Sequence, residues 1–185
     1  MTAYLETERL TLRRFTPGDV ELLVELDSDP EVMRFLTGQP TTRDEVEREI
    51  LPGFLKVYAA HEQLGTFAAY EKAGGAFAGW FGMQPTADPA AVGVGYRLLR
   101  PVWGKGYATE GTKALIARAF TELGMERVEA DTMAVNHRSR AVMRRSGLRF
   151  VKIWHEHFDD PLPGTEFGEV LYAVDRTTWE AGSHE

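Results

Sequence analysis

Residues 92–124 join a short apolar run, a glycine turn and a helical stripe without a spacer, and this limits the fold more than any other stretch. Val92 to Leu99 is short and apolar, which predicts a strand that Pro101 ends. Trp103–Gly106 predicts a tight turn, and Gly124 predicts the end of the helix that follows. The apolar stripe of that helix recurs at helical spacing, at Ala108, Thr112, Leu115, Ile116, Ala119, Phe120 and Leu123.

A glycine turn before a helix favours a bound anion, because glycine lets the backbone approach a ligand and the helix start offers free N–H groups. The stretch therefore predicts a pyrophosphate site, although an ordinary strand-to-helix turn explains this signal alone equally well. A nucleotide P-loop would need Ser or Thr where the chain has Gly106. A dinucleotide fingerprint would need Gly or Ala at Thr109, although Glu126 and Glu129 lie near the place of its ribose-binding acid.

The 185 residues predict a single domain, 1–185, with a core over about 6–179. The net charge of −7 argues against nonspecific nucleic-acid or membrane binding, and the lack of a leader or a long apolar run predicts a cytoplasmic protein. Cysteine is absent, which excludes disulfides and a cysteine nucleophile. His155 and His157 fall on one face of an expected strand without further ligands, so no metal is expected.

The rest of the chain predicts a mixed sheet with helices on it, in the order β-αα-βββ-α-β-α-ββ. Pro52-Gly53 falls inside a helical stripe and predicts a kink or a division of that helix. The expected strands are Glu8–Phe15, Thr66–Lys72, Phe77–Met83, Val92–Leu99, Arg127–Val135, Leu148–Phe158 and Val170–Val174. The expected helices begin after Thr16, Asp29, Thr42, Gly106 and Asn136.

A second group of residues follows the central helix by one strand: Asn136, Ser139, Val142, Arg144-Arg145 and Ser146–Phe150. Together with Gly95-Tyr96, Trp103–Glu110 and Asp29–Phe35, these motifs resemble the GNAT N-acetyltransferase superfamily. Within it they resemble the ribosomal-protein N-terminal (Rim-type) acetyltransferases and their small-molecule relatives. The resemblance spans roughly Glu6 to Trp179 and depends on the order and spacing of the motifs.

This resemblance implies an α/β (α+β) fold: a mixed, mostly antiparallel twisted sheet of about seven strands, with splayed fourth and fifth strands and helices on both faces. Acetyl-CoA is then the co-substrate, with its pantetheine arm on the edge strand and its pyrophosphate on the glycine turn. Pro101 departs from the Gln or Arg of many relatives, and Arg100 or Lys105 could supply that charge. The implied coenzyme-binding residues are Tyr96, Arg97, Leu98, Gly104, Lys105, Gly106, Tyr107, Ala108, Thr109, Asn136, Ser139 and Arg144.

Asn136 and Ser139 carry roles by resemblance: the Asn holds the coenzyme arm, and the Ser hydroxyl protonates the departing thiolate. The plainer alternative is a helix cap followed by a first-turn serine. A basic cluster of Arg138, Arg140, Arg144 and Arg145 is either a solvated helix face or a site for the 3′-phosphate end of CoA.

The general base is not fixed by the motifs, because Gly93 stands where several relatives carry Glu. The remaining candidates are Glu110, Glu129, Asp131, Glu169 and Tyr172. Glu169 and Tyr172 are preferred, because similar sequences place an acid near the start of the last strand. A backbone N–H near Leu98 is the expected oxyanion donor.

Without a cysteine, the expected mechanism is direct attack of an amine on the thioester in a ternary complex. At pH 7 roughly 10% of an α-amine is neutral but only about 0.04% of a lysine amine, a difference of about 3.3 kcal/mol, so a weakly equipped site favours α-amines or low-pKa small-molecule amines. The acceptor is thus a peptide N-terminus or a small molecule, and a homodimer agrees with similar enzymes. The alternative is a catalytically weak acyl-CoA sensor of the same fold.

Overall fold

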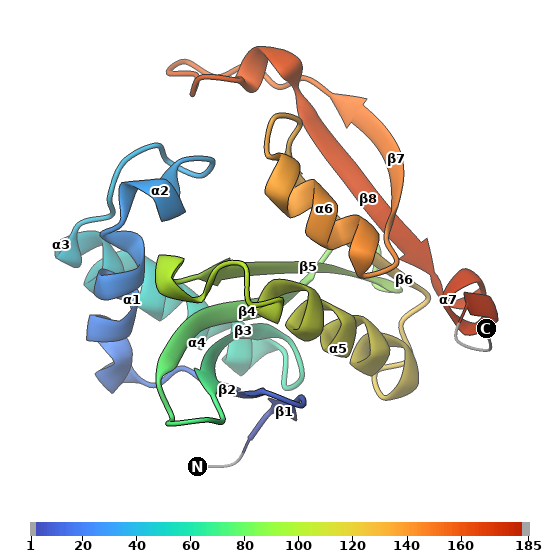
Figure 1. Cartoon of the computed structure of the whole chain (residues 1–185), viewed down its shortest axis with the longest axis horizontal. Helices are drawn as coiled ribbons and strands as arrows, with labels where there is room; N and C mark the ends of the chain where they lie inside the picture. Colours follow the sequence, from blue (N-terminus) through green and yellow to red (C-terminus); the bar gives the residue numbers. More distant parts are fainter. Residues whose placement is uncertain (1–2, 183–185) are drawn as a thin grey trace.

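The computed structural model describes residues 3–182, whose strands form one eight-stranded sheet in the order β1-β2-β3-β4-β5-β6-β8-β7 (Figure 1). Only β5 and β6 pair in parallel, and every other neighbouring pair is antiparallel. The strands are β1 (Leu5–Glu6), β2 (Leu10–Arg14), β3 (Gly65–Glu71), β4 (Phe77–Pro85), β5 (Ala91–Leu98), β6 (Arg127–Met133), β7 (Arg149–Trp154) and β8 (Glu169–Asp175). The sheet confirms the expected mixed architecture.

The helices lie on both faces of the sheet, as expected. The α-helices are α1 (Val20–Asp27), α2 (Pro30–Met33), α3 (Arg43–Glu45), α4 (Leu51–Ala60), α5 (Tyr107–Thr121), α6 (His137–Arg145) and α7 (Arg176–Gly182). Single 3-10 turns cover Pro17–Asp19, Arg100–Val102 and Thr165–Phe167, and a π turn covers Val46–Ile50.

An apolar core lies on each face of the sheet. The larger core joins α5 and α6 to one face, through residues such as Phe81, Leu115 and Met143. The smaller core joins α1, the π turn and α4 to the other face, through residues such as Leu23 and Ala68. Because side chains alternate along a strand, Val92, Val94 and Leu98 of β5 point into the larger core, and the residues between them face the other side of the sheet.

Close packing of α5 on β4 depends on a glycine in the first turns of the helix. A Cβ added at Gly111 would lie 2.3 Å from Cε1 of Phe81, whose ring is fully buried. Gly111 therefore lets the start of α5 lie directly against the sheet, beside the glycine turn that precedes the helix.

Several local expectations are corrected. The short strand β1 and the helix α7 were not anticipated, which gives eight strands instead of about seven. The helix containing Pro52 is divided, as expected, but by the π turn that ends at Ile50. Pro52 has no N–H to donate to the preceding turn, which accounts for the local change of hydrogen-bond pattern.

The strand expected over Leu148–Phe158 ends at Trp154, so His155 and His157 do not lie on it. The strand expected over Arg127–Val135 likewise ends at Met133. Among residues 3–182, no helix combines the length and the apolar character needed to cross a membrane.

Candidate active site

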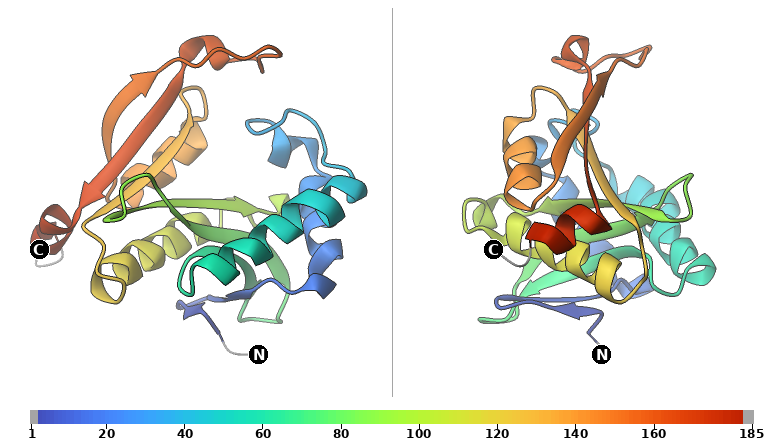
Figure 2. Two further views of the ribbon diagram at one scale, coloured as in Figure 1. Left: turned by 180° about the vertical axis from the view of Figure 1, so that it is seen from behind. Right: turned by 90° about the vertical axis from the view of Figure 1, so that its right-hand side faces the viewer.

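The sheet opens between β5 and β6. The two strands pair only from Ala91 with Arg127 to Gly93 with Glu129, and then diverge. Figures 1 and 2 show β7 and β8 rising away from the β2–β5 half of the sheet, with α6 beside the rising strands. The splay expected between the fourth and fifth predicted strands is therefore present, between β5 and β6. After Gly93, β5 has a free edge within the described chain.

Backbone groups of this edge face the opening. The N–H of Leu99 donates to Ala78 O on β4 at 2.9 Å. Because peptide groups alternate along a strand, the N–H and C=O of Leu98 and of Tyr96 point to the side away from β4. The indole Nε1–H of Trp103 donates to Leu98 O at 2.8 Å, whereas the Leu98 N–H faces the opening as the expected oxyanion donor.

The glycine turn lies between this edge and α5. Gly104 and Gly106 have φ of 78° and 86°, in the left-handed region that favours glycine. No atom would lie within 4 Å of a Cβ added at Gly104, so the turn exposes bare backbone there. Since α5 begins at Tyr107, the N–H groups of Gly106 to Thr109 belong to the helix start, where an anion is stabilised.

The cations expected near this turn are engaged elsewhere. Lys105 Nζ lies 3.1 Å from a carboxylate oxygen of Glu71, and Arg100 Nε lies 2.8 Å from one of Asp29. Lys105 therefore offers its backbone to an anion at the turn, while the charge of its side chain is partly neutralised by Glu71.

Of the four arginines of α6, it is Arg138 that lies beside the turn. Its guanidinium carbon stands 5.3 Å from the centre of the Trp103 ring. Arg144, the arginine expected to bind the coenzyme, instead directs Nη1 toward the Tyr172 hydroxyl at 3.5 Å. The sequence placed Arg138 in the basic cluster but did not indicate which of the four arginines lies beside the turn, because the contact with Trp103 depends on how α6 packs.

Asn136 and Ser139 lie at the start of α6. Asn136 Oδ1 accepts from Ser139 N–H at 3.2 Å, and Asn136 Nδ2 donates to Thr132 Oγ1 at 3.1 Å. The plainer role of Asn136 as a helix cap is thus present. Burial raises the pKa of Tyr96, and a hydrogen bond with Ser139 opposes that rise, so the Ser139 side chain lies beside the Tyr96 side chain of β5.

The structure separates the two preferred base candidates. Glu169 and Tyr172 are three residues apart on β8, so they point to opposite faces of the sheet. Tyr172 is buried, and its hydroxyl accepts from Arg140 Nε at 3.2 Å. Burial alone would raise the pKa of Tyr172, but the bonds from Arg140 and Arg144 outweigh it and hold that pKa below its usual value. Tyr172 thus packs α6 onto β8.

Glu169 shares its face of the sheet with Asp131. Asp131 pairs with Leu171 in the β6–β8 register, which sets Glu169 diagonally across from it. Asp131 is exposed, but partial desolvation by the surrounding protein raises its pKa, and the charges of Glu156 and Glu129 add to this. Burial likewise raises the pKa of Glu169, with added repulsion from Asp131 and Glu156. Two carboxyl groups with raised pKa values therefore stand beside the splay.

The other two acids are held in ion pairs. Glu110 accepts from Thr7 Oγ1 at 2.6 Å and from Arg9 N at 2.8 Å. Burial would raise the pKa of Glu110, but these bonds and the Arg9 charge lower it. Glu129 lies 2.7 Å from Arg127 Nε. Glu110 is thus held against the β1–β2 segment, whereas Glu129 pairs with Gly93 where the splay begins and is bound there by Arg127.

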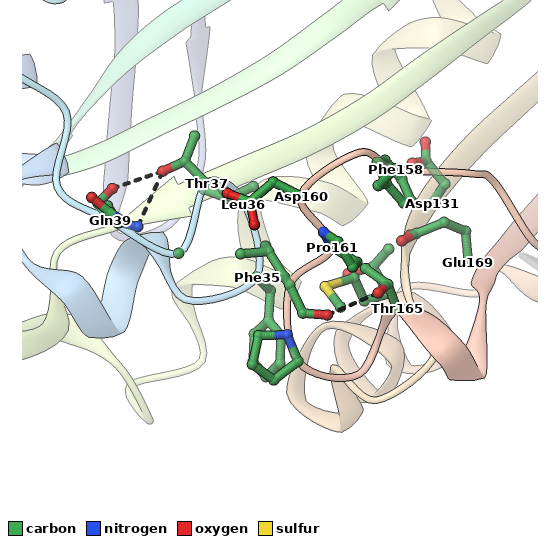
Figure 3. A pocket seen from close by; sticks show the side chains of 15 residues that line it. Phe35, Leu36, Thr37, Gln39, Asp131, Phe158, Asp160, Pro161, Thr165 and Glu169 are labelled. Atoms are coloured by element: carbon green, nitrogen blue, oxygen red, sulfur yellow. Dashed lines mark hydrogen bonds between the residues drawn. The ribbon is translucent and has the colours of Figure 1, made fainter.

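Two pockets open beside the acids. The loop pocket, of about 500 Å³, lies between residues 35–39 and 158–165 and includes Asp131 and Glu169. Figure 3 shows these two carboxylates together at one end of it, with Thr37 and Gln39 at the other. The sheet pocket, of about 440 Å³, lies over β4 and β5 beneath Ile50 and Phe54. Asp131 lines both pockets.

The floor of the sheet pocket is a feature that sequence reasoning missed. Gly82 pairs with Gly95 across β4 and β5, and Gly93 lies two residues before Gly95 on the same face. At one end Arg97 forms a 2.6 Å ion pair with the fully buried Asp27. This contact joins residues 70 positions apart, so no local pattern announces it.

Over the described residues, no group of three or more His, Cys, Asp or Glu side chains is arranged to hold a metal ion. The polar groups of the site are instead backbone N–H groups, hydroxyls and carboxyls.

The comparisons with known proteins agree with this geometry. The family model "Acetyltransferase (GNAT) domain" matches residues 9–149. An FsC-acetyl coenzyme A-N(2)-transacetylase of Aspergillus fumigatus is 35% identical over 184 residues, covering 95% of this chain and 77% of the relative.

Solved structures show the same fold. A GNAT-family acetyltransferase from Bacillus anthracis has a TM-score of 0.79 at 21% identity, covering 94% of this chain and 98% of that one. RimL, a ribosomal L7/L12 alpha-N-protein acetyltransferase solved with coenzyme A, has a TM-score of 0.77 at 19% identity with the same coverage. At these identities the two likenesses show the fold alone. The splayed sheet, the glycine turn and the matched family model together show that this chain belongs to the GNAT acetyltransferase family, as an acetyl-CoA-dependent acyltransferase.

Proposed function

We propose that the protein transfers the acetyl group of acetyl-CoA to a primary amine, by direct attack of the amine in a ternary complex. The observation that carries this proposal is the free edge of β5 beside the glycine turn, where amide groups and a helix start face one opening. A sheet edge suits the amides of a pantetheine arm, and the helix start suits a pyrophosphate. The name of the Aspergillus relative, which specifies transfer to an N(2) nitrogen, supports an amine acceptor.

The acceptor approaches from the face opposite α5 and α6. Tyr96 and Ser139 lie on the α6 side of the splay, whereas Gly95, Arg97 and Asp131 line the pocket on the other side. Coenzyme and amine therefore meet across the gap between β5 and β6, and neither has to pass the other.

Asp131 and Glu169 are the groups that we assign to proton removal. The amine nitrogen forms a bond to the thioester carbonyl carbon and gives up a proton to a carboxylate of this pair. The Leu98 N–H stabilises the oxyanion, and the C–S bond then breaks. Ser139 gives its hydroxyl proton to the leaving thiolate and regains a proton through water, while the carboxyl group returns to water the proton that it took from the amine, so that the net products are the amide and the free thiol. Glu169 thus keeps the role expected from the sequence, and Asp131 takes the place beside it that Tyr172 does not occupy.

Thiol release from acetyl-CoA, measured against a panel of amines, tests the proposal. The expected result is saturable release with α-amines or low-pKa small-molecule amines, and a lower kcat/KM on lysine side chains in matched peptides. Double-reciprocal plots over both substrates should intersect. Parallel lines with a trapped acyl-enzyme would contradict direct attack, and binding of acetyl-CoA without release to any amine would favour the sensor alternative.

A further inference from the structure

The two pockets described above share one carboxylate in their linings, and this arrangement constrains the shape of the acceptor. The inference rests on the proposed transfer to an amine. Asp131 is the residue that the loop pocket shares with the sheet pocket. Each pocket has a volume within the range of small-molecule sites, at about 500 and 440 Å³.

The loop pocket is closed by a contact between its two loops. Gly38, with φ of 72°, approaches Leu162 so closely that an added Cβ would lie 2.5 Å from Leu162 Cδ2. The exposed Leu36 side chain, 50% accessible, lines the same pocket. An apolar group entering here would therefore be covered on the side where the loops touch.

The sheet pocket is open because its floor lacks side chains. A Cβ added at Gly95 would meet no atom within 4 Å, and one at Gly93 would meet only ordinary contacts at 3.9 and 4.0 Å. These glycines have φ outside the left-handed region, so the backbone does not require glycine there. The missing side chains leave room above the strand without easing strain in it.

We infer that the acceptor carries its amine on a carbon with two substituents, one seated in each pocket, with the nitrogen at Asp131. An amine at the end of an unbranched chain would reach Asp131 through one pocket and leave the other unfilled. A branched amine, such as the α-amine of an amino-acid amide or a peptide, fills both. The residues that select the two substituents are then Gly95 in the sheet pocket and Leu36 in the loop pocket.

Three matched amines test this inference. The best α-amine of the thiol-release panel is compared with two analogues, one lacking the side chain and one lacking the carboxamide, with rates expressed per neutral amine. The missing side chain is expected to lower kcat/KM by about tenfold or more, since burying an aliphatic group of this size favours binding to that extent. The missing carboxamide is expected to lower it by up to about tenfold, the scale of a single hydrogen bond. Equal kcat/KM for the three amines would overturn the inference while leaving the proposed transfer intact.

Two variants then assign the arms to the pockets. Gly95→Val narrows the sheet pocket, and Leu36→Trp fills the loop pocket. Each is expected to remove the preference for one arm, and the two variants should affect different arms. If both variants lost the preference for the same arm, or if neither variant lost a preference, the assignment of the arms to the pockets would be contradicted. Circular dichroism and a melting curve check the fold, and Gly95→Ala replaces Gly95→Val if the latter does not fold. If no amine in the panel is acetylated, the proposed function fails first, which is a separate outcome.

Discussion

Gly111→Ala tests whether the start of α5 needs a glycine to lie against β4. In most helices this substitution stabilises, by about 1 kcal/mol, because alanine has the higher helix propensity. Here the new Cβ would lie 2.3 Å from Phe81 Cε1 and 2.4 Å from Phe81 Cζ. That is more than about 1 Å below an ordinary contact of roughly 3.5 Å. Phe81 is fully buried and packs 6.0 Å from the Tyr96 ring, so neither ring nor helix can move without disturbing the site.

A matched variant separates the two effects. Gly53 lies in α4, and an added Cβ there meets no atom within 4 Å. Gly53→Ala should therefore gain the propensity term alone, whereas Gly111→Ala also carries the overpacking cost of about 1–3 kcal/mol. The two variants should differ by that amount in free energy of unfolding, which corresponds to roughly 2–12 °C in melting temperature for a chain of this size.

Urea unfolding followed by circular dichroism measures the difference, and the KM for acetyl-CoA provides a second readout. Gly111→Ala should raise that KM, because the glycine turn moves with the start of the helix, and Gly53→Ala should leave it unchanged. Equal stabilisation by both variants would refute the account of how α5 packs on the sheet.

Three further predictions concern charged groups of the site. Because the folded-state pKa of Asp131 is raised, ionisation above the unfolded pKa costs stability, so Asp131→Asn should raise the unfolding midpoint at pH 7 and lower kcat/KM by about 10²–10⁴. An unchanged rate would remove Asp131 from catalysis. The opposite sign applies to Glu110, whose pKa is lowered: Glu110→Gln should destabilise the chain at pH 7, and the gap to wild type should close as the pH falls through the folded pKa. A gap that persists in acid would contradict this. Arg138→Gln should raise the KM for acetyl-CoA about tenfold without changing that for the amine, since a hydrogen bond to a charged group contributes on that scale. Arg144→Gln is the control, expected to lower the melting temperature through Tyr172, and a larger KM effect from Arg144 than from Arg138 would reverse the assignment.

The sequence predicted best what local chemistry determines. Pro101 and the glycines of the turn break a strand and start a helix through their own backbone preferences, so β5 and α5 were found with nearly correct ends. The two-residue strand β1 is too short for any periodicity. The alternation of His155 and His157 resembled a strand, but β7 ends before them because β8 pairs with β7 only as far as Trp154.

The candidate site could be predicted only in part, because some of its contacts follow from local spacing and others from the packing of distant elements. That Glu169 and Tyr172 point to opposite faces follows from their spacing of three once β8 is known to be a strand. That Glu169 meets Asp131 depends on the register of β6 with β8, which pairs segments about forty residues apart. Likewise, the contact of Arg138 with Trp103 and the ion pair of Arg97 with Asp27 arise only from the packing of whole elements.

The opening between β5 and β6 passes through a wall that is a single sheet thick. In the proposed transfer, coenzyme and amine would each have an entrance of their own, and the acetylated product could depart while the thiol remains bound. The architecture would then impose no order of binding, so an inactive analogue of the amine should be noncompetitive, not uncompetitive, toward acetyl-CoA. An amine that belongs to a larger molecule could also be acetylated, because the rest of that molecule would stay on the side of the sheet opposite the nucleotide.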